Sequence, residues 1–150
     1  MDVVSEIITV GNELISGIQV DTNGAYLAEQ LWSRGIPVRR IVSVGDDATA
    51  LAAALIESLA RAPIVLVTGG LGPTADDLTT EVVARALRRE LACDPQAMAH
   101  LTVLLGTYGL ALTEEQKKQA CFPLGAEVLP NPRGTAPGFL LREGDGVLIV

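Results

Sequence analysis

The sequence predicts an α/β fold: a three-layer α/β/α sandwich whose sheet is mainly parallel, with an antiparallel excursion near the C-terminus. Short, wholly aliphatic runs such as residues 64–67 have the length and composition of buried strands. Helical patterns lie between these runs, and strands joined by helices are typical of a parallel sheet covered on both faces. Near the C-terminus, Asp145 and Gly146 form a tight hairpin turn between two strand candidates, which adds the antiparallel part.

The first half of the chain alternates strand and helix. Asp21, Thr22 or Asn23 can cap a helix that runs to about Arg34, and Gly35 can end it as the C′ residue. A second helix is expected after residues 46–47, where three leucines repeat at every fourth position. An amphipathic run predicts a third helix at residues 82–91. The strands of this half are expected at residues 3–10, 38–44 and 64–67.

The second half departs from this alternation. Asp94 and Pro95 form a helix start, with the aspartate as cap and the proline in the first turn, and the helix reaches about Thr107. Thr113 and Gln116 have the spacing of a capping box for a short helix that ends near residue 120. Three strands are then expected, at residues 127–130, 138–142 and 146–150.

Composition and charge limit the possible functions. A chain of 150 residues with 49% hydrophobic residues fits a single domain, spanning residues 1–150. Its net charge of −7 argues against nucleic-acid binding, which needs a basic surface. No apolar run approaches the roughly 20 residues of a membrane span, and the N-terminus lacks the basic region of a signal peptide. We therefore expect a cytoplasmic protein without a membrane partner.

Two further features concern the cysteines and the C-terminus. Cys93 and Cys121 lie far apart and match no metal-binding spacing, so two reduced cysteines are expected in a cytosolic protein. The last strand candidate ends at Val150 with the chain itself. A buried strand usually leads into a further segment, and we therefore expect the natural protein to continue past this residue.

The strongest candidate site is the glycine-rich segment 68–79, which follows the strand at residues 64–67. Such a turn between a strand and a helix presents backbone N–H groups to an anion, beside the positive end of the helix dipole. Asp76 and Asp77 would repel a phosphate unless a divalent metal ion lies between them and the ligand. The alternative is a tight turn in which Asp77 only caps the helix. The predicted phosphate-binding residues are Gly69, Gly70, Gly72 and Thr74.

Two other loops are expected near it, because ligands bind beyond the carboxyl ends of the strands in open α/β sheets. In the loop at residues 11–23, Gly11, Asn12 and Glu13 are candidate ligand contacts and Glu13 is a candidate metal ligand. Asp21 is explained by helix capping. The alternative for this loop is a set of turn glycines followed by an N-cap.

The loop at residues 131–138 is rich in proline and glycine. Asn131, Gly134 and Thr135 can bind a base or a phosphate through amide and hydroxyl groups. Arg133 could meet a phosphate, although a single loop arginine is more often solvated. The alternative is a rigid surface turn. His100 is the only histidine and lies within a helix, so a catalytic triad has no support.

Together, the three loops resemble the N-terminal domain of the CinA family, the bacterial competence/damage-inducible proteins. The similar stretches are VGNELISG with DTN at residues 21–23, TGGLGPTADDLT at residues 68–79, and PNPRGTAPG at residues 130–138. That domain is in turn similar to the molybdopterin-binding fold of MoaB, MogA and the gephyrin/MoeA proteins. The resemblance spans the whole chain in order and spacing, but the family continues into a Pro-Gly-Pro-Pro loop that this chain does not reach.

The resemblance implies a metal-dependent nucleotide pyrophosphatase, acting on ADP-ribose or a similar dinucleotide. Asp77 would be the catalytic residue, and Asp76, Asp77 and Glu13 would hold the divalent metal ion. It also implies a homo-oligomer. The alternatives are a molybdopterin-binding domain of molybdenum cofactor biosynthesis, in which the carboxylate that matches Asp77 acts in pterin adenylylation, or a non-catalytic interaction domain. Turnover by the 150-residue form is expected to be weak or absent without the closing loop.

Overall fold

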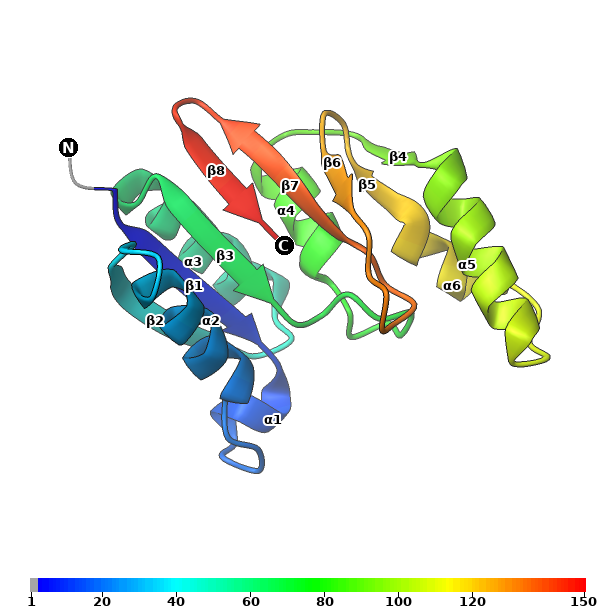
Figure 1. The fold of residues 1–150 in the computed structure, drawn as a ribbon, viewed down its shortest axis with the longest axis horizontal. Helices are drawn as coiled ribbons and strands as arrows, with labels where there is room; N and C mark the ends of the chain where they lie inside the picture. The colour runs from blue at the N-terminus through cyan, green and yellow to red at the C-terminus, as the bar shows by residue number, and fades with distance from the viewer. Residues whose placement is uncertain (1–2) are drawn as a thin grey trace.

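A mixed six-stranded sheet forms the centre of the molecule in the computed structural model, which describes residues 3–150 (Figure 1). The strand order is β2-β1-β3-β8-β7-β6. Strands β1, β2, β3 and β8 are parallel to one another, and β7 and β6 continue the sheet in antiparallel pairs. The strands are β1 Ser5–Val10, β2 Val38–Val44, β3 Ile64–Thr68, β6 Glu127–Leu129, β7 Gly138–Glu143 and β8 Gly146–Ile149. The predicted fold class is therefore confirmed.

The helices lie where local sequence signals predicted them, apart from α1 (Asn12–Ile15), which forms within the expected loop at residues 11–23, and one further exception. Asp21 accepts a hydrogen bond from the N–H of Gly24 and caps α2, and Asp94 caps α5 in the same way. The capping box of Thr113 and Gln116 is present at the start of α6. The helices are α1 Asn12–Ile15, α2 Thr22–Trp32, α3 Ala48–Arg61, α4 Thr79–Ala86, α5 Pro95–Thr107 and α6 Glu114–Lys117, followed by the 3₁₀ turn η1 Lys118–Ala120.

The further exception is the amphipathic run at residues 82–91. Helix α4 ends at Ala86, and Leu91–Cys93 instead forms strand β4. Strand β4 pairs antiparallel with β5, Cys121–Pro123, in a second, two-stranded sheet that the sequence patterns did not reveal. Three-residue strands are too short to show an alternating pattern.

The cysteine prediction is wrong for the same reason. Cys93 and Cys121 are directly opposite each other in the β4–β5 pair and form a disulfide bond. A separation of 28 residues along the sequence gave no sign that the two strands would meet.

The main core lies between the sheet and the helices behind it. Ile8, Val65 and Leu148 come from neighbouring strands and belong to one core cluster with residues of α3 and α4, which lie behind the sheet (Figure 1). The ring centroids of Phe139 in β7 and Phe122 in β5 lie 5.8 Å apart, and this contact joins the second sheet to the core. Burying side chains of this size contributes roughly 1.5–3 kcal/mol each to the stability of the fold.

The opposite face of the sheet is only partly covered. Helix α2 lies over β1 and β2, whereas within residues 3–150 no helix covers β3, β8 and β7 on this side (Figure 1). The paired residues Leu66, Ile149 and Leu140 form an aliphatic row across these three strands. Ile149 and Leu140 are half-buried.

One carboxylate is buried at the sheet. Glu6 of β1 is only 3% exposed, and its oxygens accept hydrogen bonds from Ser58 at 2.7 Å and from Arg61 at 2.9 and 3.1 Å. These bonds attach α3 to β1. The bond from Arg61 is the main cause that lowers the pKa of Glu6, with smaller contributions from Ser58 and from the nearby arginine charges, while burial opposes the shift.

The three loops singled out in the sequence lie at one edge of the sheet. They follow β1, β3 and β6, which all run in the same direction, so their carboxyl ends meet at this edge (Figure 1). No helix in the described part of the chain is long and apolar enough to cross a membrane.

Candidate functional site

The backbone of the glycine-rich loop depends on two glycines at its start. Gly69 has φ +102°, and a Cβ there would lie 2.1 Å from the carbonyl oxygen of Val10. Gly70 has φ +66°, and a Cβ there would lie 2.4 Å from Oγ1 of Thr79. Only glycine fits both the conformation and the space. The loop can therefore pass directly over the end of β1.

Thr79 attaches this backbone to α4. Its N–H donates to the carbonyl of Gly70 at 3.1 Å and its hydroxyl donates to the carbonyl of Gly69 at 2.8 Å. No acceptor among the described residues takes the N–H groups of Gly70 and Leu71. Two backbone donors beside the first turn of an eight-residue helix are suited to an anion.

The side chain of Asp77 is hydrogen-bonded to Thr74 within the same loop. Its Oδ2 accepts hydrogen bonds from the N–H of Thr74 at 2.9 Å and from the hydroxyl of Thr74 at 2.6 Å. It does not cap α4, whose N-cap residue is Leu78. The simple capping alternative for Asp77 is therefore wrong.

The pKa of Asp77 reflects these contacts. Burial raises the pKa, but the bonds from Thr74, the backbone of Gly72 and the charge of Lys118 together outweigh burial and lower it below its usual value. The carboxylate is therefore ionised at neutral pH. It can accept hydrogen bonds or bind a cation, and it cannot supply a proton as a general acid.

Two residues that sequence reasoning had not selected hold the loop from the other side. Nζ of Lys118 donates to the carbonyl oxygens of Thr74 and, at 3.0 Å, of Asp77. Nε2 of the buried Gln119 donates to the carbonyl of Leu71 at 3.3 Å and to Oγ1 of Thr135 at 3.2 Å. The local sequence around Lys118 and Gln119 does not predict these contacts. Their partners in the glycine-rich loop lie more than 40 residues earlier in the chain, and Thr135 lies 16 residues later.

A cavity of about 190 Å³ opens beside this loop. Its lining includes Gly70, Gly72 and Asp77, three of the candidate site residues. Glu81, in the first turn of α4, adds a second carboxylate that the sequence analysis did not select. The remaining lining residues are Leu71, Thr80, Leu91, Lys118 and the two disulfide-bonded cysteines.

The loop after β1 borders a separate, smaller cavity of about 80 Å³. Exposed Glu13 lines it together with Asp21, Thr68 and Gly69, so the two cavities border adjacent residues, Gly69 and Gly70. Asn12 does not line either one. It exchanges hydrogen bonds with Asp46 at 3.1 and 3.2 Å and thereby joins α1 to the loop after β2. The buried Gly11 is in contact with the Glu13 side chain, since a Cβ there would lie 2.4 Å from its Oε1.

The side chain of Asn131 organises its own loop. Its Oδ1 accepts from the N–H groups of Arg133 and Gly134 at 2.9 and 3.0 Å, and its Nδ2 donates to the carbonyl of Ala136 at 2.9 Å. Its amide is thus engaged within the turn. Thr135 is the residue of this loop that meets the glycine-rich loop, through Gln119.

The predicted three-carboxylate metal site is not formed. Among residues 3–150, no three His, Cys, Asp or Glu side chains lie together as a possible metal site. Glu13 and Asp77 line different cavities, and Asp76 is exposed and lines neither. A cage of three protein ligands therefore does not fit these residues. Asp77 and Glu81 are the two carboxylates that line the 190 Å³ cavity.

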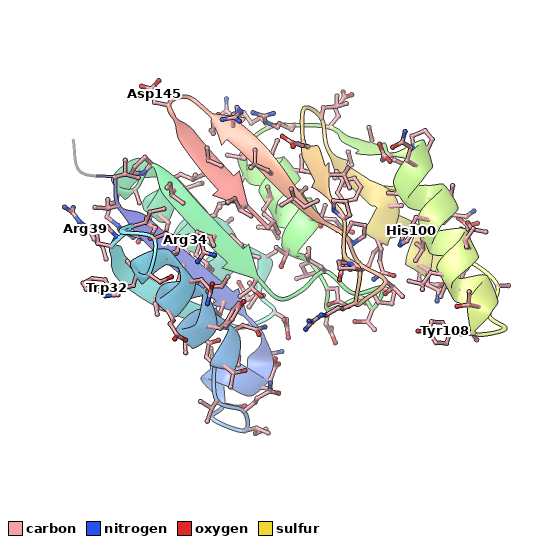
Figure 2. All side chains as sticks on the ribbon, viewed as in Figure 1. Trp32, Arg34, Arg39, His100, Tyr108 and Asp145 are labelled. Atoms are coloured by element: carbon pink, nitrogen blue, oxygen red, sulfur yellow. A yellow bond between two sulfur atoms is a disulfide. The ribbon has the colours of Figure 1, made fainter. Side chains whose placement is uncertain are left out.

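His100 lines a further cavity together with Asn131 and Pro137 of the loop at residues 131–138, but it does not line either cavity beside the glycine-rich loop. Figure 2 shows His100 on α5, Tyr108 just after the end of that helix, and Trp32 on the outer side of α2. Trp32 is 72% exposed and His100 is also exposed. Neither contributes to the core or to the two cavities beside the glycine-rich loop.

The fold and the glycine-rich site define a molybdopterin-binding-type α/β domain. Residues 6–150 match the family model described as "Probable molybdopterin binding domain". A molybdopterin biosynthesis protein from Mycobacterium abscessus shares the fold, with a TM-score of 0.63 and 19% identity over 99% of this chain and 80% of that one.

Within this class, the chain belongs to the CinA-like family. It is 47% identical over 141 residues to a CinA-like protein from Desulfosudis oleivorans, covering 94% of this chain and 34% of that protein. The crystal structure of CinA from Thermoplasma acidophilum superposes with a TM-score of 0.91 and 36% identity, covering 99% of this chain and 88% of that one. The chain spans about a third of the length of the curated relatives it matches.

Proposed function

We propose that this domain is a nucleotide pyrophosphatase of the CinA type that acts on ADP-ribose or a similar dinucleotide with the help of a divalent cation. The observation that carries the proposal is that two cavities border adjacent residues of the glycine-rich turn, Gly69 and Gly70. A dinucleotide has two halves joined by a pyrophosphate. Its anionic centre would lie on the glycine-rich turn, and one half would extend toward each cavity.

The residues of the turn would perform binding and orientation. The N–H groups of Gly70 and Leu71 would donate to phosphate oxygens, and Gly72 would let the backbone approach without a side chain. Asp77, ionised because of its lowered pKa, would bind a cation or accept a hydrogen bond from the attacking water. Holding the reactants in this geometry removes much of the entropic part of the barrier.

A divalent cation would neutralise phosphate oxygens and make a bound water more acidic. Asp77 and Glu81 are the residues that would hold it, with phosphate oxygens completing its coordination, as is usual for Mg²⁺. This replaces the predicted set of Glu13, Asp76 and Asp77. Glu13 would instead face the other half of the ligand, because it lines the smaller cavity.

Binding of a molybdopterin is the second candidate function. The family model that matches residues 6–150 carries this description, and a pterin phosphate would use the same glycine-rich turn. The ligand is in both cases a phosphorylated small molecule. The two candidates differ in the need for a pyrophosphate and in the response to a cation.

Calorimetric titration separates the two. We expect ADP-ribose to bind at least about tenfold more tightly with Mg²⁺ than with a chelator, a difference of roughly 1.4 kcal/mol. Molybdopterin binding that exceeds ADP-ribose binding in both conditions would favour cofactor assembly instead. Equal affinity for ADP-ribose in Mg²⁺ and in chelator would remove the cation from the proposal.

Asp77→Asn tests the carboxylate directly. The amide keeps the size and one acceptor for Thr74, so the melting temperature should stay within a few degrees. Affinity for ADP-ribose in Mg²⁺ should fall by about 10- to 100-fold, as for a lost contact with a charged group, and any turnover should fall by about 100-fold or more. Asp145→Asn, in the exposed hairpin turn, is the matched control (Figure 2). An Asp77→Asn protein with unchanged affinity and turnover would contradict the assigned role.

A further inference from the structure

We propose that Lys118 and Gln119 are positioning residues that hold the glycine-rich loop and the loop at residues 131–138 in the conformation that binds the ligand. The inference rests on the proposed function for its ligand, but its structural part is independent of it. It assigns a role to the 3₁₀ turn η1, which carries neither a predicted site residue nor a recognised motif.

The contacts of Lys118 all end on one loop. Its ammonium group has three donors, and two of them are used by the carbonyl oxygens of Thr74 and Asp77. These are the residues that form the closed turn around the Asp77 carboxylate. Its positive charge also contributes to the lowered pKa of Asp77. Lys118 therefore holds the shape of the turn and adds a smaller, electrostatic contribution to the lowered pKa of its carboxylate.

Gln119 connects two loops that are remote in sequence. The side chain is only 6% exposed, and its single amide nitrogen donates to Leu71 in the glycine-rich loop and to Thr135 in the other loop. A buried amide that lost these acceptors would be costly, so the contacts are maintained in the folded state. The distance between the two loops is thereby set by one side chain.

A disulfide, a buried side chain and a backbone hydrogen bond hold η1 in position. Cys121, the next residue after η1, is bonded to Cys93 of β4, and Ala120 is fully buried in the core. Its carbonyl accepts a hydrogen bond from the N–H of Asp94 at 2.8 Å. Lys118 and Gln119 thus project from a rigid support, whereas the two loops they hold consist largely of glycine, proline and turn residues.

Adjacent lysines provide a matched pair of variants. Lys118→Met removes the charge and the donors but keeps the length of the side chain. Lys117→Met is the control, because Lys117 pairs only with Glu114 on the exposed face of α6. Gln119→Met removes the link between the loops, and Gln96→Met, at an exposed position on α5, is its control.

Hydrogen exchange of the backbone amides measures the effect without any ligand. For Lys118→Met we expect exchange to quicken by about tenfold at the hydrogen-bonded amides of Thr74, Asp77 and Thr79, and to stay unchanged at those of Arg133 and Gly134. For Gln119→Met we expect faster exchange in both loops. The two control variants should match the wild type. Unchanged exchange in both loops of both variants would overturn the proposal, as would uniformly faster exchange across the whole domain.

Titration with ADP-ribose in Mg²⁺ then tests the consequence for binding. Lys118→Met and Gln119→Met should each weaken binding by about tenfold, and Lys118→Arg should recover part of the loss, because it restores charge and donors. If loop exchange quickens but affinity is unchanged, the positioning role for the ligand is wrong. If the wild type itself does not bind ADP-ribose, the proposed function fails, and the hydrogen-exchange pattern still decides the structural part.

Discussion

The disulfide between Cys93 and Cys121 offers a direct test of the tertiary structure. The bond joins β4 to β5 and encloses α5, α6 and η1 in a loop with a sequence separation of 28. Reduction with a dithiol such as dithiothreitol opens the bond and releases two thiols, while the dithiol is oxidised to its own disulfide. The double variant Cys93→Ser/Cys121→Ser gives the same opened loop by mutation.

The size of the effect follows from the length of that loop. Cross-linking residues 28 positions apart removes about 12 cal/mol/K of entropy from the unfolded chain, which corresponds to about 3.5 kcal/mol at 25 °C. For a domain of 150 residues, each kcal/mol shifts the melting temperature by roughly 2–4 °C. Opening the disulfide should therefore lower the melting temperature by about 7–14 °C.

Thiol titration and thermal unfolding together provide the assay. In denaturant, the untreated protein should show no free thiol and the reduced protein two. The reduced protein and the double serine variant should melt at the same lower temperature, and the reductant should not affect the variant. Two free thiols in the untreated protein would refute the bond, and a reduced protein that melts within about 2 °C of the oxidised one would refute its contribution to stability.

Two other predictions concern charge and assembly. Because the folded-state pKa of Glu6 is lowered from 4.5, its contribution to stability is present above that pH and is lost as the pH falls through the folded-state pKa. Urea unfolding between pH 7 and pH 3 should therefore show a steeper loss of unfolding free energy for the wild type than for Glu6→Gln. Parallel plots of unfolding free energy against pH for the two proteins would contradict this role. The half-buried aliphatic residues on the uncovered face of β3, β8 and β7 favour association, so light scattering should give at least a dimer, and a strictly monomeric mass would contradict this expectation.

The sequence by itself determined the local elements of this domain. The predicted N-cap residues of three helices, Asp21, Asp94 and Thr113, do cap them. Such caps can be predicted from the sequence because a cap acts within one turn of its helix. The aliphatic runs likewise placed β1, β2, β3 and β8 to within about two residues of their ends. The alternation of these elements was sufficient for the α/β class, and the glycine-rich segment predicted as the main candidate loop borders the 190 Å³ cavity.

The tertiary structure alone decided which side chains meet. Lys118 reaches Asp77 across 41 positions and Gln119 reaches Leu71 across 48, so no local pattern records either contact. Local patterns also did not predict that Glu13 and Asp77 line different cavities, or that two three-residue strands are joined by a disulfide. Local signals depend on hydrogen bonds within a turn of the backbone, whereas these contacts depend on how whole elements pack, and packing is set by the summed burial of the entire core.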